Sequence, residues 1–250
     1  MTVDDVLPLL VAPFVGSFLG VLVRRLPRGV SVVRGRSACE SCGAVLGPLD
    51  LIPLLSALVL RGRCRRCGVP FSPVHWWMEL AAVAVALVAV LAEGEAGAVW
   101  AGCVLGWGLL TLGVIDFQHL RLPDALTLPL LLCGLCATAL LTPEALPAHA
   151  AAAAGGFLLL RAVALGYRAL RGREGMGGGD AKLLAAAGAW TGPDGLPAVL
   201  LLAAALGLAL ALVERLRGRS VTATTAVPFG PGLALATWAA WLAEARPWSG

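Results

Sequence analysis

The chain has 250 residues, of which 59% are hydrophobic and only 14% are charged, and its mean hydropathy is +0.86. This composition excludes an ordinary soluble domain and is typical of a polytopic membrane protein. The net charge of +4 does not indicate nucleic-acid binding, because arginines that orient membrane spans and attract anionic lipid headgroups account for it.

Eight apolar stretches approach the roughly 20 residues that a transmembrane helix needs. They lie at 6–23, 76–92, 97–115, 123–141, 147–167, 180–193, 195–213 and 224–244. Asp4 and Asp5 precede the first stretch and arginines follow it, which predicts a retained helix rather than a cleaved signal peptide. The sequence therefore predicts an all-α polytopic membrane protein with about eight transmembrane helices.

Basic residues predict the orientation. Most of the 19 Lys and Arg residues fall in the loops at 24–75, 116–122, 168–175 and 214–220, which eight alternating spans place on one side. The positive-inside rule makes that side cytoplasmic. We expect a multi-pass protein of the cytoplasmic (inner) membrane.

The long polar insertion at 24–75 separates a first transmembrane helix, 1–23, from a predicted membrane core, 76–250. It contains two CxxCG units, formed by Cys39, Cys42, Cys64 and Cys67. Paired CxxC units at this spacing predict a zinc site, because two intervening residues let one turn aim both sulfurs at one ion. The glycine after each second cysteine permits a positive φ at the turn.

Two disulfides or two redox-active pairs are the alternatives to zinc at these cysteines. The predicted cytoplasmic side argues against stable disulfides, and the duplicated motif argues against a single redox pair. Four thiolates would close the coordination shell, so we expect a structural metal in a small cytoplasmic zinc-binding loop domain.

Two aspartates mark the candidate active site. Asp116 ends the third apolar stretch, and Asp180 opens the sixth after a run of glycines. Carboxylates at membrane depth are costly and are functional candidates by default. Both are predicted at cytoplasmic ends of spans, where two carboxylates sharing one proton could act as an aspartyl protease dyad.

The glycines before Asp180, which are Gly177, Gly178 and Gly179, would let a substrate backbone approach closely, since they carry no Cβ. A phosphate-binding loop is disfavoured, because the Walker spacing is absent. Lys182 is predicted either to orient a carboxylate in this substrate-approach loop or to extend to the membrane interface.

Two further acids have open roles. Asp124 is a rival for Asp116, although its position after Pro123 also suits a helix cap. Glu79 lies just inside the second apolar stretch, where an acid suggests a binding role.

The chain resembles the type IV prepilin peptidase family over nearly its whole length. The matching motifs lie at residues 14–21, 25–27, 36–39, 52–56, 60–67, 115–124, 175–183 and 227–231. The resemblance implies that Asp116 and Asp180 are the catalytic pair and that residues 177–180 form the GxGD signature of membrane aspartyl proteases.

The resemblance also implies an activity. Family members remove the leader of prepilins and pseudopilins, whose N-terminal segment is a hydrophobic helix, by cutting after a glycine at the cytoplasmic membrane face. Members with the paired CxxC motifs often N-methylate the new terminus with S-adenosylmethionine, which makes Glu79 a candidate for methyl transfer as well as for binding. The expected partners are therefore these substrates and membrane lipids, with no nucleic acid. A peptidase without methyl transfer is one alternative, and an ion-coupled transporter or scaffold is another, although no internal repeat supports a transporter.

Overall fold

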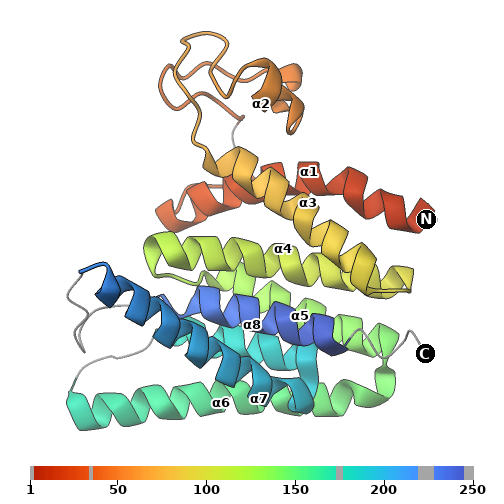
Figure 1. Ribbon diagram of the computed structural model, residues 1–250, viewed down its shortest axis with the longest axis vertical. Helices are drawn as coiled ribbons and strands as arrows, with labels where there is room; N and C mark the ends of the chain where they lie inside the picture. The colour runs from red at the N-terminus through yellow and green to blue at the C-terminus, as the bar shows by residue number, and fades with distance from the viewer. Residues whose placement is uncertain (1–2, 34–35, 173–176, 219–227, 245–250) are drawn as a thin grey trace. The chain divides into compact units, whose positions relative to one another are not determined.

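The structure is a computed structural model that describes residues 3–33, 36–172, 177–218 and 228–244. The chain divides into two compact units, 1–91 and 92–250, whose elements are labelled in Figure 1. The domain boundaries expected from the sequence, at 1–23, 24–75 and 76–250, stay a prediction.

The first unit contains two long helices, and the segment between them, 26–73, carries the four cysteines and forms the cysteine module. Its elements are α1 (Val3–Arg25), η1 (Leu26–Arg28), η2 (Pro48–Leu51), α2 (Leu55–Val59) and α3 (Val74–Ala92). A Cβ placed on Gly16 of α1 would lie 2.6 Å from the Cα of Glu79 and 2.7 Å from the carbonyl oxygen of Met78 on α3. The missing side chain therefore lets the two helix backbones touch, as small residues do between membrane helices.

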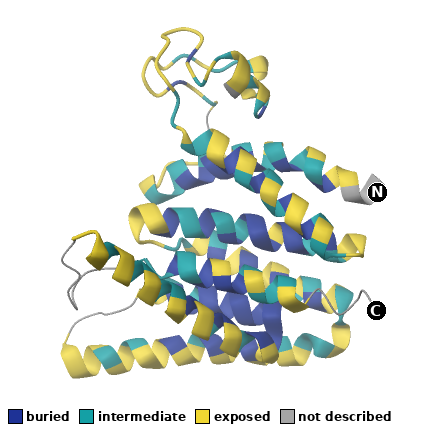
Figure 2. Ribbon diagram, in the orientation of Figure 1, coloured by how far each residue is buried: buried dark blue, intermediate teal, exposed yellow. Residues whose placement is uncertain are grey.

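The second unit is a helical bundle. Its elements are α4 (Ala96–His119), α5 (Asp124–Leu141), η3 (Pro143–Ala145), α6 (Leu146–Arg171), α7 (Gly178–Leu216) and α8 (Gly230–Glu244). Helix α7 packs against α5, α6 and α8, and Figure 2 shows the buried residues concentrated where these helices meet. A Cβ on Gly188 of α7 would lie 2.6 Å from the carbonyl oxygen of Ala152 on α6, so small residues again set the helix spacing.

Helix α7 breaks at Gly192, where φ is 63° and ψ is −169°. Pro193 has no N–H, so the carbonyl of Ala189 loses its partner four residues ahead. The Nδ1 of His149 lies 3.0 Å from that carbonyl oxygen, with the hydroxyl of Thr138 at 3.4 Å. Because a carbonyl only accepts, His149 donates to it and stabilises the break.

Six helices in the described part of the chain are long and apolar enough to cross a membrane, namely α1 with its 3₁₀ extension, α3, α4, α5, α6 and α7. The two predicted spans at 180–193 and 195–213 lie within the kinked α7. Helix α8 has 15 described residues, and residues 224–227 of its predicted span lie outside the described residues. The all-α membrane fold is confirmed, whereas the number of eight spans stays a prediction.

Candidate active site and metal centre

Asp116 and Asp180 come from different helices of the second unit and are brought together. Asp116 lies in the last turn of α4, and Asp180 lies in the first turn of α7. Their exposed fractions are only 6% and 8%, and the charge of Asp116 acts on Asp180. Two buried carboxylates that interact in this way cannot both ionise readily, which favours one shared proton.

A third helix completes this site. The backbone N–H of Gly230, the first residue of α8, donates to Oδ2 of Asp116 at 2.9 Å. A Cβ on Gly230 would lie 2.7 Å from that same oxygen and 2.9 Å from the Cγ of Asp116. Only glycine therefore lets the α8 terminus approach the carboxylate this closely, and the N–H fixes the position of one oxygen.

The glycines before Asp180 have different surroundings. A Cβ on Gly177 would meet Oδ2 of Asp180 at 3.6 Å, so space remains beside that carboxylate. A Cβ on Gly178 would lie 4.0 Å from the guanidinium of Arg161, whereas one on Gly179 would lie 2.7 Å from the Cβ of Leu122. Gly179 thus permits packing against the α4–α5 connection. The approach of a substrate backbone along the glycines before Asp180 stays a prediction. Residues 175–176 of the glycine-rich motif lie outside the described residues.

Lys182 contacts the rival acid rather than the candidate pair. Its Nζ lies 2.6 and 2.7 Å from the two carboxylate oxygens of Asp124, at the N-terminus of α5. Both side chains are partly exposed, Lys182 at 32% and Asp124 at 56%. This ion pair joins the start of α5 to the start of α7, two residues after Asp180.

The four cysteines of the module form one cluster. Their sulfur atoms all lie within 4.8 Å of one another, with Cys39 to Cys67 at 3.8 Å and Cys42 to Cys64 at 4.0 Å. Zinc bound to thiolates at about 2.3 Å in a tetrahedron separates the sulfurs by about 3.8 Å. The cluster therefore fits a tetrahedral metal shell and could hold zinc, and none of the four cysteines forms a disulfide.

The two halves of the cluster have the same local structure. Gly43 and Gly68 both have positive φ, at 68° and 70°, as the CxxCG pattern predicts. Each of their N–H groups donates at 2.9 Å to the carbonyl of the first cysteine in its unit. The backbone N–H groups of Cys42 and Ser41 lower the pKa of the Cys39 thiol to about 7. The pKa of the Cys67 thiol is raised to about 11, because burial and the other three thiols outweigh a hydrogen bond from the backbone of Val69.

Glu79 lies on α3 in the first unit, whereas the candidate peptidase pair belongs to the second unit. It is 6% exposed, and its Oε2 accepts a hydrogen bond of 2.8 Å from the backbone N–H of Leu54 in the module. Leu54 has φ 61° and ψ −48°, a conformation that is unfavourable for a residue with a branched side chain. The buried acid therefore holds a strained segment of the module.

Three contacts at these sites have no local signal in the sequence. They are the N–H of Gly230 on Asp116, the packing of Leu122 on Gly179, and the hydrogen bond from Leu54 to Glu79. The motif around Gly230 and the segment containing Leu54 do resemble family motifs, which was the only indication of their importance.

Comparisons with known proteins agree with the division of the chain into two units. Residues 10–92 match the bacterial peptidase A24 N-terminal domain, and residues 103–212 match the type IV leader peptidase family. No solved structure matches the chain.

Curated relatives cover most of the chain. A prepilin leader peptidase/N-methyltransferase of Burkholderia pseudomallei is 41% identical over 88% of this chain and 79% of its own length. Proteins of the same description from Pseudomonas aeruginosa and Aeromonas hydrophila are 36% and 38% identical, over 94% and 91% of this chain and 88% and 87% of their own lengths. The conclusion from these matches is that the chain belongs to the type IV leader peptidase family.

Proposed function

We propose that this protein is a membrane aspartyl endopeptidase that removes the leader of type IV prepilins or pseudopilins after a glycine, at the cytoplasmic face of the membrane. The observation that carries the proposal is the pair of buried aspartates, Asp116 and Asp180, contributed by two helices of the second unit. The relatives described as prepilin leader peptidases support the substrate class.

The chemistry follows from the shared proton. One carboxylate removes a proton from water as the water oxygen bonds to the scissile carbonyl carbon, and the protonated partner donates to the carbonyl oxygen. Collapse of this intermediate breaks the C–N bond, and a proton passes to the leaving amine. The N–H of Gly230, 2.9 Å from Asp116, would hold one carboxylate oxygen in place throughout.

A second activity, N-methylation of the new terminus, is part of the same proposal. The relatives described as N-methyltransferases support it. S-adenosylmethionine would supply the methyl group: the pilin amine nitrogen bonds to the methyl carbon, the carbon–sulfur bond breaks with its electron pair going to sulfur, and the amine loses a proton. The module would be held folded by structural zinc at its four cysteines.

The experiment that tests both activities uses a purified prepilin, the zinc-loaded protein and S-adenosylmethionine, with mass spectrometry of the products. Wild-type protein should shorten the substrate and add one methyl group. Asp180→Asn should leave the leader in place, yet it should methylate a pilin that was cleaved beforehand. Leader removal by Asp180→Asn at the wild-type rate contradicts the aspartyl mechanism.

A further inference from the structure

The short helix α2 of the cysteine module has an exposed apolar face. Leu55, Leu58 and Val59 follow the i, i+3, i+4 spacing that places side chains on one face of a helix, and they are 53%, 76% and 68% exposed. Leu49 of η2, which packs against α2, is 68% exposed. These four residues form what we call the α2 patch.

The other side of the same segment is occupied within the first unit. Ser56 and Leu60 face inward, Pro53 is buried, and the N–H of Leu54 donates to Glu79 on α3. These contacts hold α2 with its apolar face outward. Single exposed leucines are ordinary on a protein surface, but large apolar side chains concentrated within residues 49–59 are typical of a docking surface.

Exposed arginines follow the patch directly. They are Arg61, Arg63, Arg65 and Arg66. Asp50 is the only acid between residues 43 and 73, and it pairs with Arg65 at 3.0 Å. In the part of the chain that the structure describes, the other three guanidinium groups form no salt bridge. The patch is therefore followed by an excess of positive charge.

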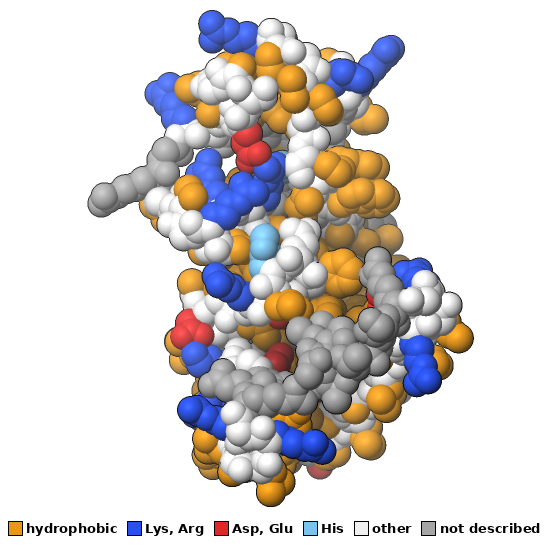
Figure 3. All heavy atoms as spheres, turned by 90° about the vertical axis from the view of Figure 1, so that its left-hand side faces the viewer, with side chains coloured by type: hydrophobic (Ala, Val, Ile, Leu, Met, Phe, Trp, Pro, Cys, Tyr) orange, Lys and Arg blue, Asp and Glu red, His pale blue; other side chains and the backbone are white. Residues whose placement is uncertain are grey.

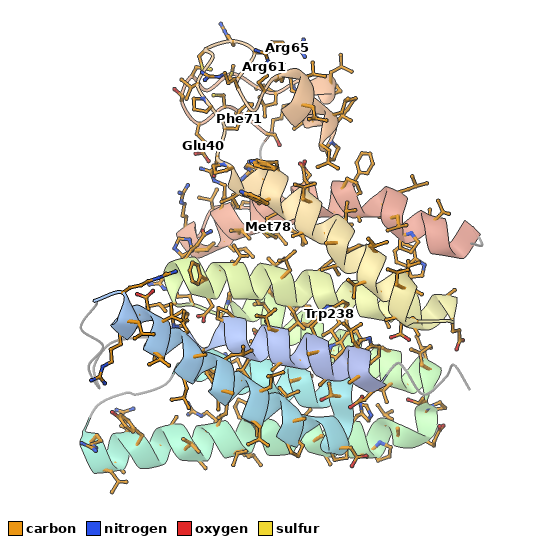
Figure 4. All side chains as sticks on the ribbon, viewed as in Figure 1. Glu40, Arg61, Arg65, Phe71, Met78 and Trp238 are labelled. Carbon is orange, nitrogen blue, oxygen red and sulfur yellow. The ribbon has the colours of Figure 1, made fainter. Side chains whose placement is uncertain are left out.

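The figures show the same arrangement. In Figure 4, Arg61 and Arg65 both come from the loop of the module that follows α2. In Figure 3, basic side chains of the module project beside hydrophobic ones. The module thus presents apolar and cationic groups together on its surface.

The module is attached to the membrane at both of its ends. It begins directly after α1 and ends directly before α3, and both helices are long and apolar enough to cross a bilayer. Attachment at two points keeps the lipid surface at a high effective concentration around the module. Even a weak affinity for lipid would therefore keep the patch bound.

Leucines beside arginines are typical of segments that lie in the membrane interface. The leucines enter the boundary between headgroups and acyl chains, and the arginines contact the phosphates of anionic lipids. We propose that the cysteine module docks on the surface of the bilayer that contains α1 and α3. The α2 patch lies in the headgroup boundary, and Arg61 and Arg66 contact anionic lipid phosphates. This docking fixes the orientation of the module and requires neither activity of the proposed function.

Photo-crosslinking to lipid tests the docking. The full-length, zinc-loaded protein carries p-benzoylphenylalanine in place of Leu58, in nanodiscs of phosphatidylglycerol and phosphatidylcholine, and mass spectrometry measures the lipid adducts after irradiation. The yield should equal that at Leu10, which is 63% exposed on α1. It should be at least about tenfold above the yield at Val45, a matched control that is 56% exposed in the module but lies outside the patch. Equal lipid yields at Val45 and Leu58 overturn the assignment to the patch.

A change of charge tests the role of the arginines. The lipid adduct at Leu58 should fall at least about threefold in nanodiscs of phosphatidylcholine alone, because arginines near a bilayer are attracted to anionic headgroups. Arg61→Gln combined with Arg66→Gln should cause a similar fall in the anionic nanodiscs, whereas the adduct at Leu10 should not change. A yield at Leu58 that is insensitive to both changes overturns the contact between the arginines and lipid phosphates.

Other partners would give other adducts. Crosslinking of position 58 to a second copy of the chain, or to an added prepilin, in place of lipid overturns docking on the bilayer, and so does the absence of any adduct. Zinc content shows whether each variant keeps the module folded, and replacement of Leu55 carries the test if replacement of Leu58 releases the metal. Neither cleavage nor methylation enters these measurements, so a failure of the docking leaves the proposed function unchanged.

Discussion

Gly230→Ala tests whether the α8 terminus positions Asp116. The added methyl carbon would lie 2.7 Å from Oδ2 of Asp116, 2.9 Å from Cγ and 3.0 Å from Cβ. Ordinary contacts of this kind are about 3.5 Å, so the carboxylate or the start of α8 must move by roughly half an ångström or more. The N–H donor to Oδ2, now at 2.9 Å, moves with it.

The expected loss is large for activity and small for folding. A hydrogen bond to a charged group contributes about 1.5–3 kcal/mol, and each 1.36 kcal/mol corresponds to a tenfold change in rate. If the dyad loses this interaction, kcat should fall by roughly 10- to 100-fold. The steric strain on stability is partly offset, because alanine favours a helix over glycine by about 0.5–1 kcal/mol.

The assay is steady-state cleavage of a prepilin, followed by mass spectrometry, with kcat and KM determined separately. We expect kcat to fall and KM to stay within about threefold, since the substrate-binding surface is not changed directly. Gly113→Ala is the matched control. Its Cβ would meet Ala234 at 3.6 Å and Pro231 at 3.8 Å, which are ordinary contacts at the same interface between α4 and α8.

The positioning role of Gly230 is refuted if Gly230→Ala cleaves prepilin with the wild-type kcat. It is also refuted if Gly113→Ala loses as much activity as Gly230→Ala, because the effect would then come from general disturbance of the α4–α8 contact. Thermal unfolding of both variants in detergent shows whether either has lost its fold.

Asp116→Asn and Asp180→Asn should each reduce leader cleavage by more than about a thousandfold while membrane insertion stays intact, because the amide cannot hold the shared proton. Membrane fractionation and cleavage assays at matched expression check this. Processing at the wild-type rate by either variant would exclude the dyad. Asp124→Asn should retain substantial cleavage, since a partly exposed ion pair contributes only about 0.2–1 kcal/mol. A greater loss of cleavage than in Asp116→Asn would mean that Asp124 is the true partner of Asp180. Exchanging the charges of Asp124 and Lys182 in a double variant should restore part of the rate lost in the single reversals, and no recovery would exclude a positioning role for their ion pair. Elemental analysis should find about one zinc per chain. Cys39→Ser should lose the metal and methyl transfer, while leader cleavage falls without disappearing. Wild-type protein that contains no metal and has four alkylatable thiols would reject the zinc site.

Several features follow from the sequence because their causes are local. Long apolar runs must be helical in lipid, where the backbone has no other hydrogen-bond partners, and the described helices follow these runs closely. The positive φ at Gly43 and Gly68 is a property of a five-residue motif. The cluster formed by the cysteines of the two CxxCG motifs requires no more than the chemistry of four thiols.

Other features depend on contacts between distant parts of the chain. Gly230 reaches Asp116 across 114 positions, and Lys182 reaches Asp124 across 58, yet no spacing in the sequence relates either pair. The break in α7 also depends on a contact between distant residues. The hydrophobic pattern predicts both halves of this helix, but it does not predict that His149 donates to the carbonyl of Ala189 at the break.

The sequence by itself therefore determined the membrane class, the cysteine cluster and the candidate catalytic acids, since composition, run length and short motifs encode these directly. Only the tertiary structure decided which groups surround each acid. Glu79 on α3 holds the strained Leu54 of the module, and Asp116 on α4 accepts from the first residue of α8. The contact at Asp116 requires a glycine at position 230, and Gly16 lets α1 approach the backbone of Glu79. Such packing depends on the shapes of whole helices rather than on any residue's neighbours along the chain.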